Sequence, residues 1–324
     1  MRLTFRWFGN DDPVTLDHIR QIPNIQCIVS AIYDIPVGEV WPEEKVTELK
    51  EMVEDHGLTL EVIESVPVHE DIKLGLISRE RYIDNFKKTI KNLGQLGIRT
   101  VCYNFMPVFD WIRSNLNKRM DDGSATLAYD HSTMMKADPL KGSIDLPGWA
   151  TDYSKEELKN LLLKYQNVSE EDLWDHLSYF LQKVVPYAEE YGVKLAIHPD
   201  DPPWSVFGLP RIITNKKSLE RVINIVDSPS NGLTICTGSL GVSEENNVPE
   251  IISYFGKKNR LNFLHFRNVK ITGQNCFEET AHLSKSGSLN MYAVLKAAVE
   301  TGFDGPIRPD HGRMIWGEEG RPGY

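Results

Sequence analysis

The chain has 324 residues, of which 41% are hydrophobic and 25% are charged, and this composition is typical of a globular protein with a large core. Its formal net charge of -10 argues against nucleic acid or an anionic membrane as the main partner, and no run approaches the roughly 18 apolar residues that a membrane span needs. The N-terminus does not resemble a signal peptide and the four cysteines are too scattered for a disulfide framework, so the sequence predicts a reduced, cytoplasmic protein.

Eight short runs rich in β-branched and aromatic residues predict β-strands along the chain. Each run is long enough for one barrel or sheet strand, and helical patterns separate the runs. The predicted strands cover residues 3–8, 25–33, 58–64, 100–104, 194–198, 232–236, 262–266 and 306–310.

The helical patterns between these strands have recognisable ends. Pro42 and the two glutamates after it predict the start of a helix that ends near Gly57. An apolar stripe within residues 83–93 predicts a second helix, because its members recur every three or four positions. Ser154 and Ser169 each precede an acidic residue by three positions, which is the spacing of a capping box at a helix start.

Alternating strands and helices predict a parallel sheet, and eight repeats favour a closed (β/α)8 TIM barrel over an open doubly wound sheet. The first strand is not followed by a Gly-x-Gly-x-x-Gly motif, which weakens the alternative of a dinucleotide-binding fold. We therefore expect a single α/β barrel domain over residues 1–324.

Two segments depart from a regular barrel. Residues 105–168, after the fourth predicted strand, form an insertion rich in Trp, Tyr, Met and Pro, which we expect to cap the carboxyl face of the barrel. The chain also ends at Tyr324, soon after the eighth predicted strand, with no eighth helix. We expect that the sequence continues beyond this point, and the alternative is that another subunit covers that flank.

Four potential metal ligands stand at the ends of consecutive predicted strands: His198, Cys236, His265 and Asp310. Barrel enzymes place their reactive groups at the carboxyl ends of the strands, so these side chains are expected to converge. Two imidazoles, a thiolate and a carboxylate suit a first-row divalent metal such as Fe, Co, Zn or Mn. The alternative is that they are packed core residues, as we predict for Cys27 and Cys102.

Basic side chains flank the predicted metal site in an otherwise acidic protein. Arg267, Arg308 and Arg313 are predicted to bind an anionic substrate, and a carboxylate fits better than a phosphate because the chain has no glycine-rich phosphate loop. The alternative is that these arginines form ordinary salt bridges with nearby acids.

The first four predicted strands also end in side chains that suit a pocket wall. Trp7 and Asn104 are predicted to contact the substrate, and Tyr33 and Glu64 end the second and third strands. Acidic residues 200–201, in a proline-rich loop after the fifth strand, are expected to be solvated.

Several stretches closely resemble the D-mannonate dehydratase family of hexuronate breakdown. The similarity runs from the first strand to Tyr324, and the combination of motifs is specific. The stretches are residues 6–9 (RWFG), 146–149 (LPGW), 197–203 (IHPDDPP), 234–239 (TICTGS), 265–268 (HFRN) and 308–313 (RPDHGR).

This resemblance implies a xylose-isomerase-like barrel, a Mn2+ or Fe2+ ion, a homodimer, and dehydration of D-mannonate to 2-dehydro-3-deoxy-D-gluconate in hexuronate (glucuronate) catabolism. It implies the same four metal ligands that the strand ends suggest. It also implies that His311 transfers a proton, and that Tyr324 lies in a segment similar to the one that supplies a second proton-transfer group. Family members continue past this tyrosine.

Loss of water from a sugar acid requires removal of a weakly acidic proton beside a carboxylate, and a divalent metal stabilises the resulting charge. His311 could take the C2 proton or protonate the departing C3 hydroxyl, with Tyr324 as its counterpart. The nearest alternative function is a metal-dependent sugar isomerase or epimerase on the same barrel. A catalytically idle carbohydrate-binding protein and a metal-dependent phosphodiesterase are further alternatives, and sparse basic residues weaken the latter.

Overall fold

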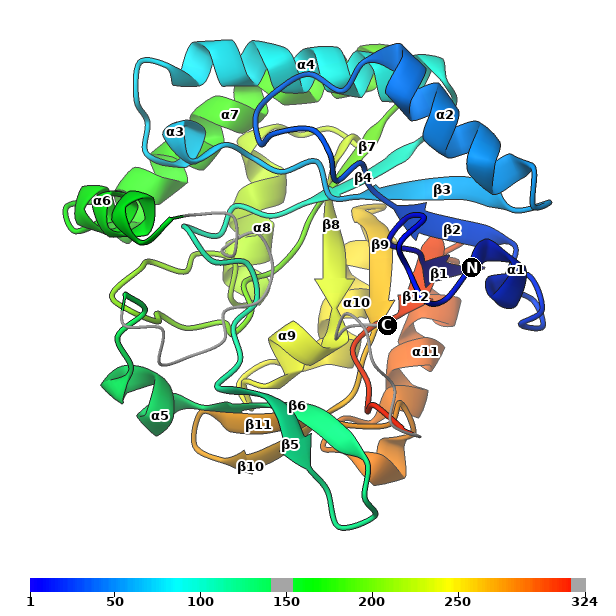
Figure 1. Cartoon of the computed structure of the whole chain (residues 1–324), viewed down its shortest axis with the longest axis vertical. Helices are drawn as coiled ribbons and strands as arrows, with labels where there is room; N and C mark the ends of the chain where they lie inside the picture. Colours follow the sequence, from blue (N-terminus) through cyan, green and yellow to red (C-terminus); the bar gives the residue numbers. More distant parts are fainter. Residues whose placement is uncertain (141–153, 316–324) are drawn as a thin grey trace.

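Eight parallel strands close into a barrel at the centre of the computed structural model, which describes residues 1–140 and 154–315 (Figure 1). The predicted (β/α)8 barrel is confirmed. In spatial order the barrel strands are β1 (Arg2–Arg6), β12 (Pro306–Pro309), β9 (Leu261–Phe266), β8 (Asn231–Cys236), β7 (Lys194–Ile197), β4 (Thr100–Tyr103), β3 (Thr59–Glu64) and β2 (Cys27–Ser30).

Helices follow the strands and cover the outside of the barrel. Figure 1 shows α2, α4 and α7 along one flank and α10 and α11 along the other. The helices outside the inserted segment are α1 (Leu16–Ile19), α2 (Glu43–Glu54), α3 (Glu70–Lys73), α4 (Arg79–Gln95), α7 (Glu170–Glu190), α8 (Lys216–Ile225), α9 (Thr237–Gly241), α10 (Val248–Lys257) and α11 (Met291–Glu300), with a 3-10 turn η2 (Ser284–Ser286).

The sequence patterns have direct counterparts in these elements. All six residues of β8 are buried, because a parallel barrel strand is covered on both faces. The apolar stripe within residues 83–93 is the buried face of α4. Ser154 and Ser169 both form the predicted capping boxes, at the starts of α6 (Lys155–Tyr165) and α7. These local signals therefore fixed where the helices begin and which face they bury.

Several predicted strands are longer than the observed ones at their carboxyl ends. The run predicted over residues 25–33 pairs only over β2, and the backbone then leaves the ladder to enter the loop toward α2. Trp7, Asn104, His198 and Asp310 consequently lie just beyond their strands. These positions are at the mouth of the barrel, where the loops converge.

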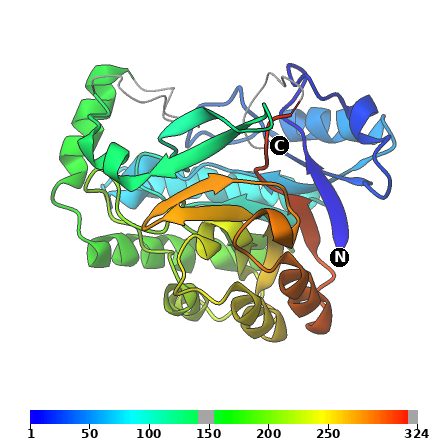
Figure 2. The same cartoon turned by 90° about the horizontal axis from the view of Figure 1, so that it is seen from below.

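A second, four-stranded sheet was not predicted. Its strands β5 (Asn115–Arg119) and β6 (Ala125–Asp130) belong to the inserted segment, whereas β10 (Val269–Gly273) and β11 (Cys276–Glu279) follow β9. The antiparallel pairing of β6 with β11 joins the two hairpins (Figure 2). The β10–β11 hairpin has mixed polar sequence without the apolar run of a barrel strand, which is why strand counting missed it.

The inserted segment also carries α5 (His131–Lys136) and α6, and it packs against the loops that follow the barrel strands. Phe109, Ile112 and Tyr129 of this segment share an apolar cluster with Leu209 after β7 and Phe277 of β11. The insertion and the loops at the carboxyl end of the barrel are therefore held by one common core. Across residues 1–140 and 154–315, no helix is both long and apolar enough to cross a membrane.

Candidate metal centre and active site

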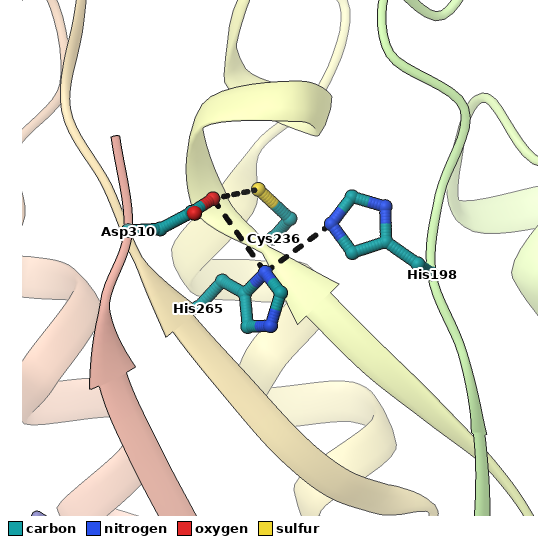
Figure 3. Close-up of side chains that lie close together, drawn as sticks. All are labelled: His198, Cys236, His265 and Asp310. Atoms are coloured by element: carbon teal, nitrogen blue, oxygen red, sulfur yellow. Dashed lines mark hydrogen bonds and ion pairs between the residues drawn. The ribbon is translucent and has the colours of Figure 1, made fainter. Parts of the chain in front are cut away.

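Four side chains from four neighbouring barrel strands converge at the carboxyl end of the barrel (Figure 3). Cys236 ends β8 and His265 lies near the end of β9, paired in register with it, while His198 and Asp310 follow β7 and β12 directly. One ligand atom from each residue lies within 4.8 Å of the others. The side chains that the sequence grouped as ligands are thus neighbours in space.

The atoms that face one another are all potential metal donors. Asp310 Oδ2 lies 3.5 Å from both Cys236 Sγ and His265 Nδ1, and His265 Nδ1 lies 3.2 Å from His198 Nε2. Apart from His198, which is partly exposed, all are buried. Two nitrogens, one sulfur and one carboxylate oxygen directed at a single point fit a first-row divalent ion.

The two histidines present different nitrogens to this point. His198 Nδ1 lies 2.6 Å from the carbonyl oxygen of Pro199, so this nitrogen carries the proton and donates it, which leaves Nε2 free to bind. His265 is turned the other way, with Nδ1 toward Asp310 and Nε2 toward Glu64 at 3.4 Å. The site therefore combines Nε2 of one histidine with Nδ1 of the other.

The sulfur of Cys236 is held by donors on its own turn and by a buried guanidinium. Cys236 is the N-cap of α9, where Sγ accepts from the backbone N–H of Ser239 at 3.4 Å and from its hydroxyl at 3.1 Å. Arg267 Nη1 donates to Sγ at 3.7 Å. Burial alone would raise the pKa of this thiol, but the charge of Arg267 and hydrogen bonds with both histidines lower the pKa to about 6. The thiolate, which is the form that binds metals, is accordingly favoured.

Arg308 holds the carboxylate of Asp310 in one orientation. Its Nη2 donates to Asp310 Oδ1 at 2.7 Å, which leaves Oδ2 directed at the other three donors. Burial opposes ionisation of this carboxyl, but the charge of Arg308 acts in the opposite direction, and the pKa of Asp310 lies well below its usual range. In the structure Arg308, which the sequence assigned to substrate binding, is buried and pairs with Asp310 and Glu64.

Arg267 belongs to a buried quartet of charges, which we define as Arg113, Asp201, Arg267 and Glu279. Arg113 contacts Asp201 at 2.9 Å and Glu279 at 2.7 Å, and Arg267 contacts the same two acids at 2.7 and 2.6 Å. The side chains of all four are at most 2% exposed. The expectation that acids 200–201 are solvated was therefore wrong, because two arginines cover Asp201 and Arg211 lies 3.9 Å from the equally buried Asp200.

The quartet links the inserted segment to the candidate metal ligands. Arg113 comes from the insertion, Asp201 from the loop after β7, Arg267 from the end of β9 and Glu279 from β11. Gly238 makes the arrangement possible, because a Cβ at this position would lie 2.5 Å from Arg267 Nε. Sequence reasoning missed Arg113 and Glu279, which stand 166 residues apart and match no short motif.

We expect replacement of Arg113 by methionine to lower the free energy of unfolding by about 3–5 kcal/mol, because it leaves two buried carboxylates to share one guanidinium. Denaturant titration measures this change. The matched control is Arg119→Met, which removes an exposed arginine from the neighbouring strand β5 and should change stability by no more than about 0.5 kcal/mol. Equal stability of the Arg113→Met and parent proteins would contradict a structural role for the quartet.

His311 lies beside the four candidate metal ligands without being one of them. Its Nε2 is 3.5 Å from Asp310 Oδ1, its Nδ1 is 4.0 Å from Glu279 Oε1, and Trp111 meets its ring edge-on with centroids 4.9 Å apart. Burial lowers the pKa of His311 to about 4, with the charges of Arg267 and Arg113 acting in the same direction. The imidazole is therefore neutral near pH 7, as a general base requires.

Other residues predicted for the site have partners or lie elsewhere. Asn104 donates to Asp110 at 3.0 Å and accepts from the backbone N–H of Met106, and Arg313 pairs with Asp122 in the β5–β6 hairpin. Trp7 lines a hollow of about 340 Å³ beside β1 and β2 that none of the four metal-ligand candidates lines. Tyr324 and the 146–149 motif fall outside the described residues. Cys27 and Cys102 are buried, as predicted.

Comparison with known proteins gives a consistent result over the whole chain. Residues 1–324 match the D-mannonate dehydratase (UxuA) family. Mannonate dehydratase 2 of Halalkalibacterium halodurans is 60% identical over 324 residues, which are 100% of this chain and 94% of the relative. Mannonate dehydratase of Thermotoga maritima is 57% identical over an alignment that covers 100% of this chain and 92% of the relative.

Solved structures agree with the sequence comparison. The crystal structure of mannonate dehydratase from Streptococcus suis serotype 2 superposes with a TM-score of 0.92 at 51% identity, covering 98% of this chain and 87% of that one. A D-psicose 3-epimerase from Clostridium cellulolyticum H10 superposes with a TM-score of 0.58 at 13% identity, covering 95% and 84%, and this likeness shows the fold alone. The chain therefore belongs to the D-mannonate dehydratase family, a family of metal-dependent hydro-lyases.

Proposed function

We propose that this chain removes water from D-mannonate to give 2-dehydro-3-deoxy-D-gluconate in hexuronate (glucuronate) catabolism. We further propose that Mn2+ or Fe2+ is the ion, and that His198, Cys236, His265 and Asp310 bind it. One observation carries the proposal: donor atoms of these four residues face a single point, and all but His198 are buried. A neutral histidine, His311, lies beside them. Family membership supplies the substrate.

The reaction needs a base for the proton at C2 and an acid for the hydroxyl that leaves C3. An ion held by the four proposed ligands would supply a Lewis acid for the negative charge that develops at the carboxylate end of the substrate. Among the described residues, His311 Nδ1 is a buried atom without a hydrogen-bond partner. This nitrogen has a free lone pair in the neutral ring, so it can accept a proton from the substrate.

The surroundings of His311 favour proton transfer at that one atom. Nε2 faces the Asp310 carboxylate, so the proton of the neutral ring is favoured there and Nδ1 is left as the acceptor. Trp111 packs against the ring and restricts its rotation. Tyr324 stays a prediction as the second proton-transfer group, which would perform the proton transfer that His311 does not.

Incubation with a panel of aldonic acids tests the proposed function. Protein loaded with Mn2+ should form a 2-keto-3-deoxy acid from D-mannonate. A chelator should abolish the activity, because the proposed reaction depends on the bound ion. The panel includes epimers of D-mannonate as matched controls for stereochemical preference. Absence of a 2-keto-3-deoxy product from every aldonate would overturn the proposal.

Other predictions from the sequence accompany this proposal. We expect Trp7, Asn104 and Arg313 to contact the sugar acid, which for Asn104 and Arg313 requires exchange of their present partners. Arg267 and Arg308 would bind it only if they left their buried ion pairs, so we assign them to orienting the ligands Cys236 and Asp310. The homodimer, the cytoplasmic location and the absence of a nucleic-acid partner stay predictions.

A further inference from the structure

Glu64, at the end of β3, stands on the opposite side of His265 from the proposed metal. Its Oε2 lies 3.4 Å from His265 Nε2, 3.1 Å from Arg308 Nε and 3.3 Å from Arg6 Nη1. An imidazole nitrogen and two guanidiniums thus surround one carboxylate oxygen. The sequence predicted only that Glu64 forms part of the wall of a pocket.

The hydrogens at this position can be assigned from the inventory of donors and acceptors. With His265 Nδ1 directed at the metal, Nε2 must carry the ring proton. Arg308 Nε lies 3.4 Å from the same nitrogen and donates to it when that nitrogen is unprotonated. A guanidinium has no acceptor for the proton that Nε2 carries when Nδ1 binds a metal. Glu64 Oε2 lies 3.4 Å from Nε2, and among the described residues it has no hydrogen-bond partner, so it offers an acceptor for this proton.

Glu64 is itself fixed on both sides. Arg308 binds it through Nε and, at 3.3 Å, through Nη2, and the same Nη2 also donates to Asp310 Oδ1. Arg6 is held in turn by the hydroxyl of Tyr33, which accepts from Nη2 at 3.0 Å. The carboxylate therefore has little freedom to turn away from His265.

A metal bound by Glu64 itself is a competing explanation, because Glu64, Cys102 and His265 also place donor atoms within 4.8 Å of one another. The two guanidiniums on Glu64 argue against it, since they already supply the positive charge that a cation would bring. Burial also raises the pKa of the Cys102 thiol well above its usual value, which disfavours the thiolate.

We propose that Glu64 is a positioning residue of the metal centre: it accepts the Nε2 proton of His265, which turns Nδ1 toward the metal and makes the ring a stronger ligand. Arg308 connects Glu64 to a second proposed ligand, because it contacts both Glu64 and Asp310. Carboxylates that accept from a ligand histidine set its tautomer and orientation in this way. The proposal rests on the ligand set proposed above.

Titration of the metal-free protein with Co2+ tests this role without a turnover assay. Glu64→Gln keeps the size of the side chain and removes its charge, and we expect it to weaken Co2+ binding by about 10- to 100-fold. Glu61→Gln is the matched control, because Glu61 lies on the same strand but pairs with Arg2, an exposed arginine at the other end of the barrel. It should leave the affinity unchanged.

Proton NMR of the Co2+-loaded protein gives a readout that a purely structural role would not move. The parent protein should show two exchangeable, cobalt-shifted imidazole N–H signals, one from each ligand histidine. In Glu64→Gln the signal of His265 should shift and exchange faster with water, whereas that of His198, which donates to Pro199, should stay. If this variant does not fold, Glu64→Asp keeps the charge but shortens the reach, and it should show the same changes to a smaller degree.

The outcomes separate this inference from the ligand assignment. A parent protein that shows neither a thiolate-to-cobalt absorption band nor shifted N–H signals would overturn the ligand set itself. A parent protein that shows both, with unchanged affinity and N–H signals in the Glu64 variants, would overturn the role of Glu64 alone.

Discussion

Replacement of Cys236 by serine should weaken binding of the divalent metal by more than the roughly 10- to 100-fold that loss of a ligand's hydrogen-bond partner costs. The sulfur lies 3.5 Å from Asp310 Oδ2, and three hydrogen bonds donated to it favour its thiolate form. Serine retains the size and the hydrogen bonds, but its hydroxyl does not ionise near neutral pH and is a poor ligand for such ions.

Metal affinity, measured by competition with a chelator, checks this expectation. Cys102→Ser is the matched control, because Cys102 is a buried barrel cysteine whose sulfur accepts a hydrogen bond from Thr234 rather than from Arg267. It should bind metal as the parent does. Equal metal content in the Cys236→Ser and parent proteins would remove Cys236 from the ligand set.

Replacement of His311 by asparagine should leave the metal in place and lower kcat by about 100- to 10,000-fold, the range that loss of a general acid–base group produces. His311 faces Asp310 Oδ1, the oxygen that Arg308 holds, rather than the oxygen directed at the other ligands. Its removal therefore takes away the proton acceptor Nδ1 without removing a metal ligand.

Parallel measurement of metal content and of steady-state kinetics separates the two functions. The control His56→Asn changes a histidine at the end of α2, whose ring bonds to the carbonyl of Met52, and should affect neither quantity. Turnover near the parent rate in His311→Asn would exclude this residue from catalysis, and loss of metal would show that it acts on the centre itself.

The convergence of the four proposed metal ligands was predictable from the sequence because topology brings them together. In a closed parallel barrel every strand ends at the same rim, so residues 29 to 45 positions apart in the sequence become neighbours once the strands are identified correctly. Cys236 and His265 even share a register pair between β8 and β9. Predicting the barrel was therefore almost sufficient to predict that these four side chains lie close together.

The roles of the arginines were not predictable from the same signals. Arg267 and Arg308 flank the ligands in sequence, which is consistent with substrate binding or with structural pairing. Their partners Glu279 and Glu64 lie on other strands, and short-range patterns do not encode which side chains meet across the barrel mouth. In the structure both arginines form salt bridges, as the alternative interpretation of the sequence predicted.

The second sheet escaped prediction for a related reason. Its hairpins come from two separate segments, and neither has the apolar run that identifies a barrel strand. The four-stranded sheet forms because β6 pairs with β11. This pairing joins two segments that lie far apart in the sequence. It carries Arg113 and Glu279 into the same buried quartet, so the missed sheet and the missed charges are parts of one arrangement.

The most direct test of metal-dependent dehydration is the NMR spectrum of the product formed from D-mannonate by the Mn2+-loaded protein in D2O, recorded after removal of the ion. Removal of the C2 proton and loss of the C3 hydroxyl give an enol, which becomes a 2-keto acid when C3 takes up one solvent deuteron. We predict 2-dehydro-3-deoxy-D-gluconate with one deuterium at C3. An aldonate that keeps all its hydroxyl groups and carries deuterium at C2 would contradict the account and identify an epimerase.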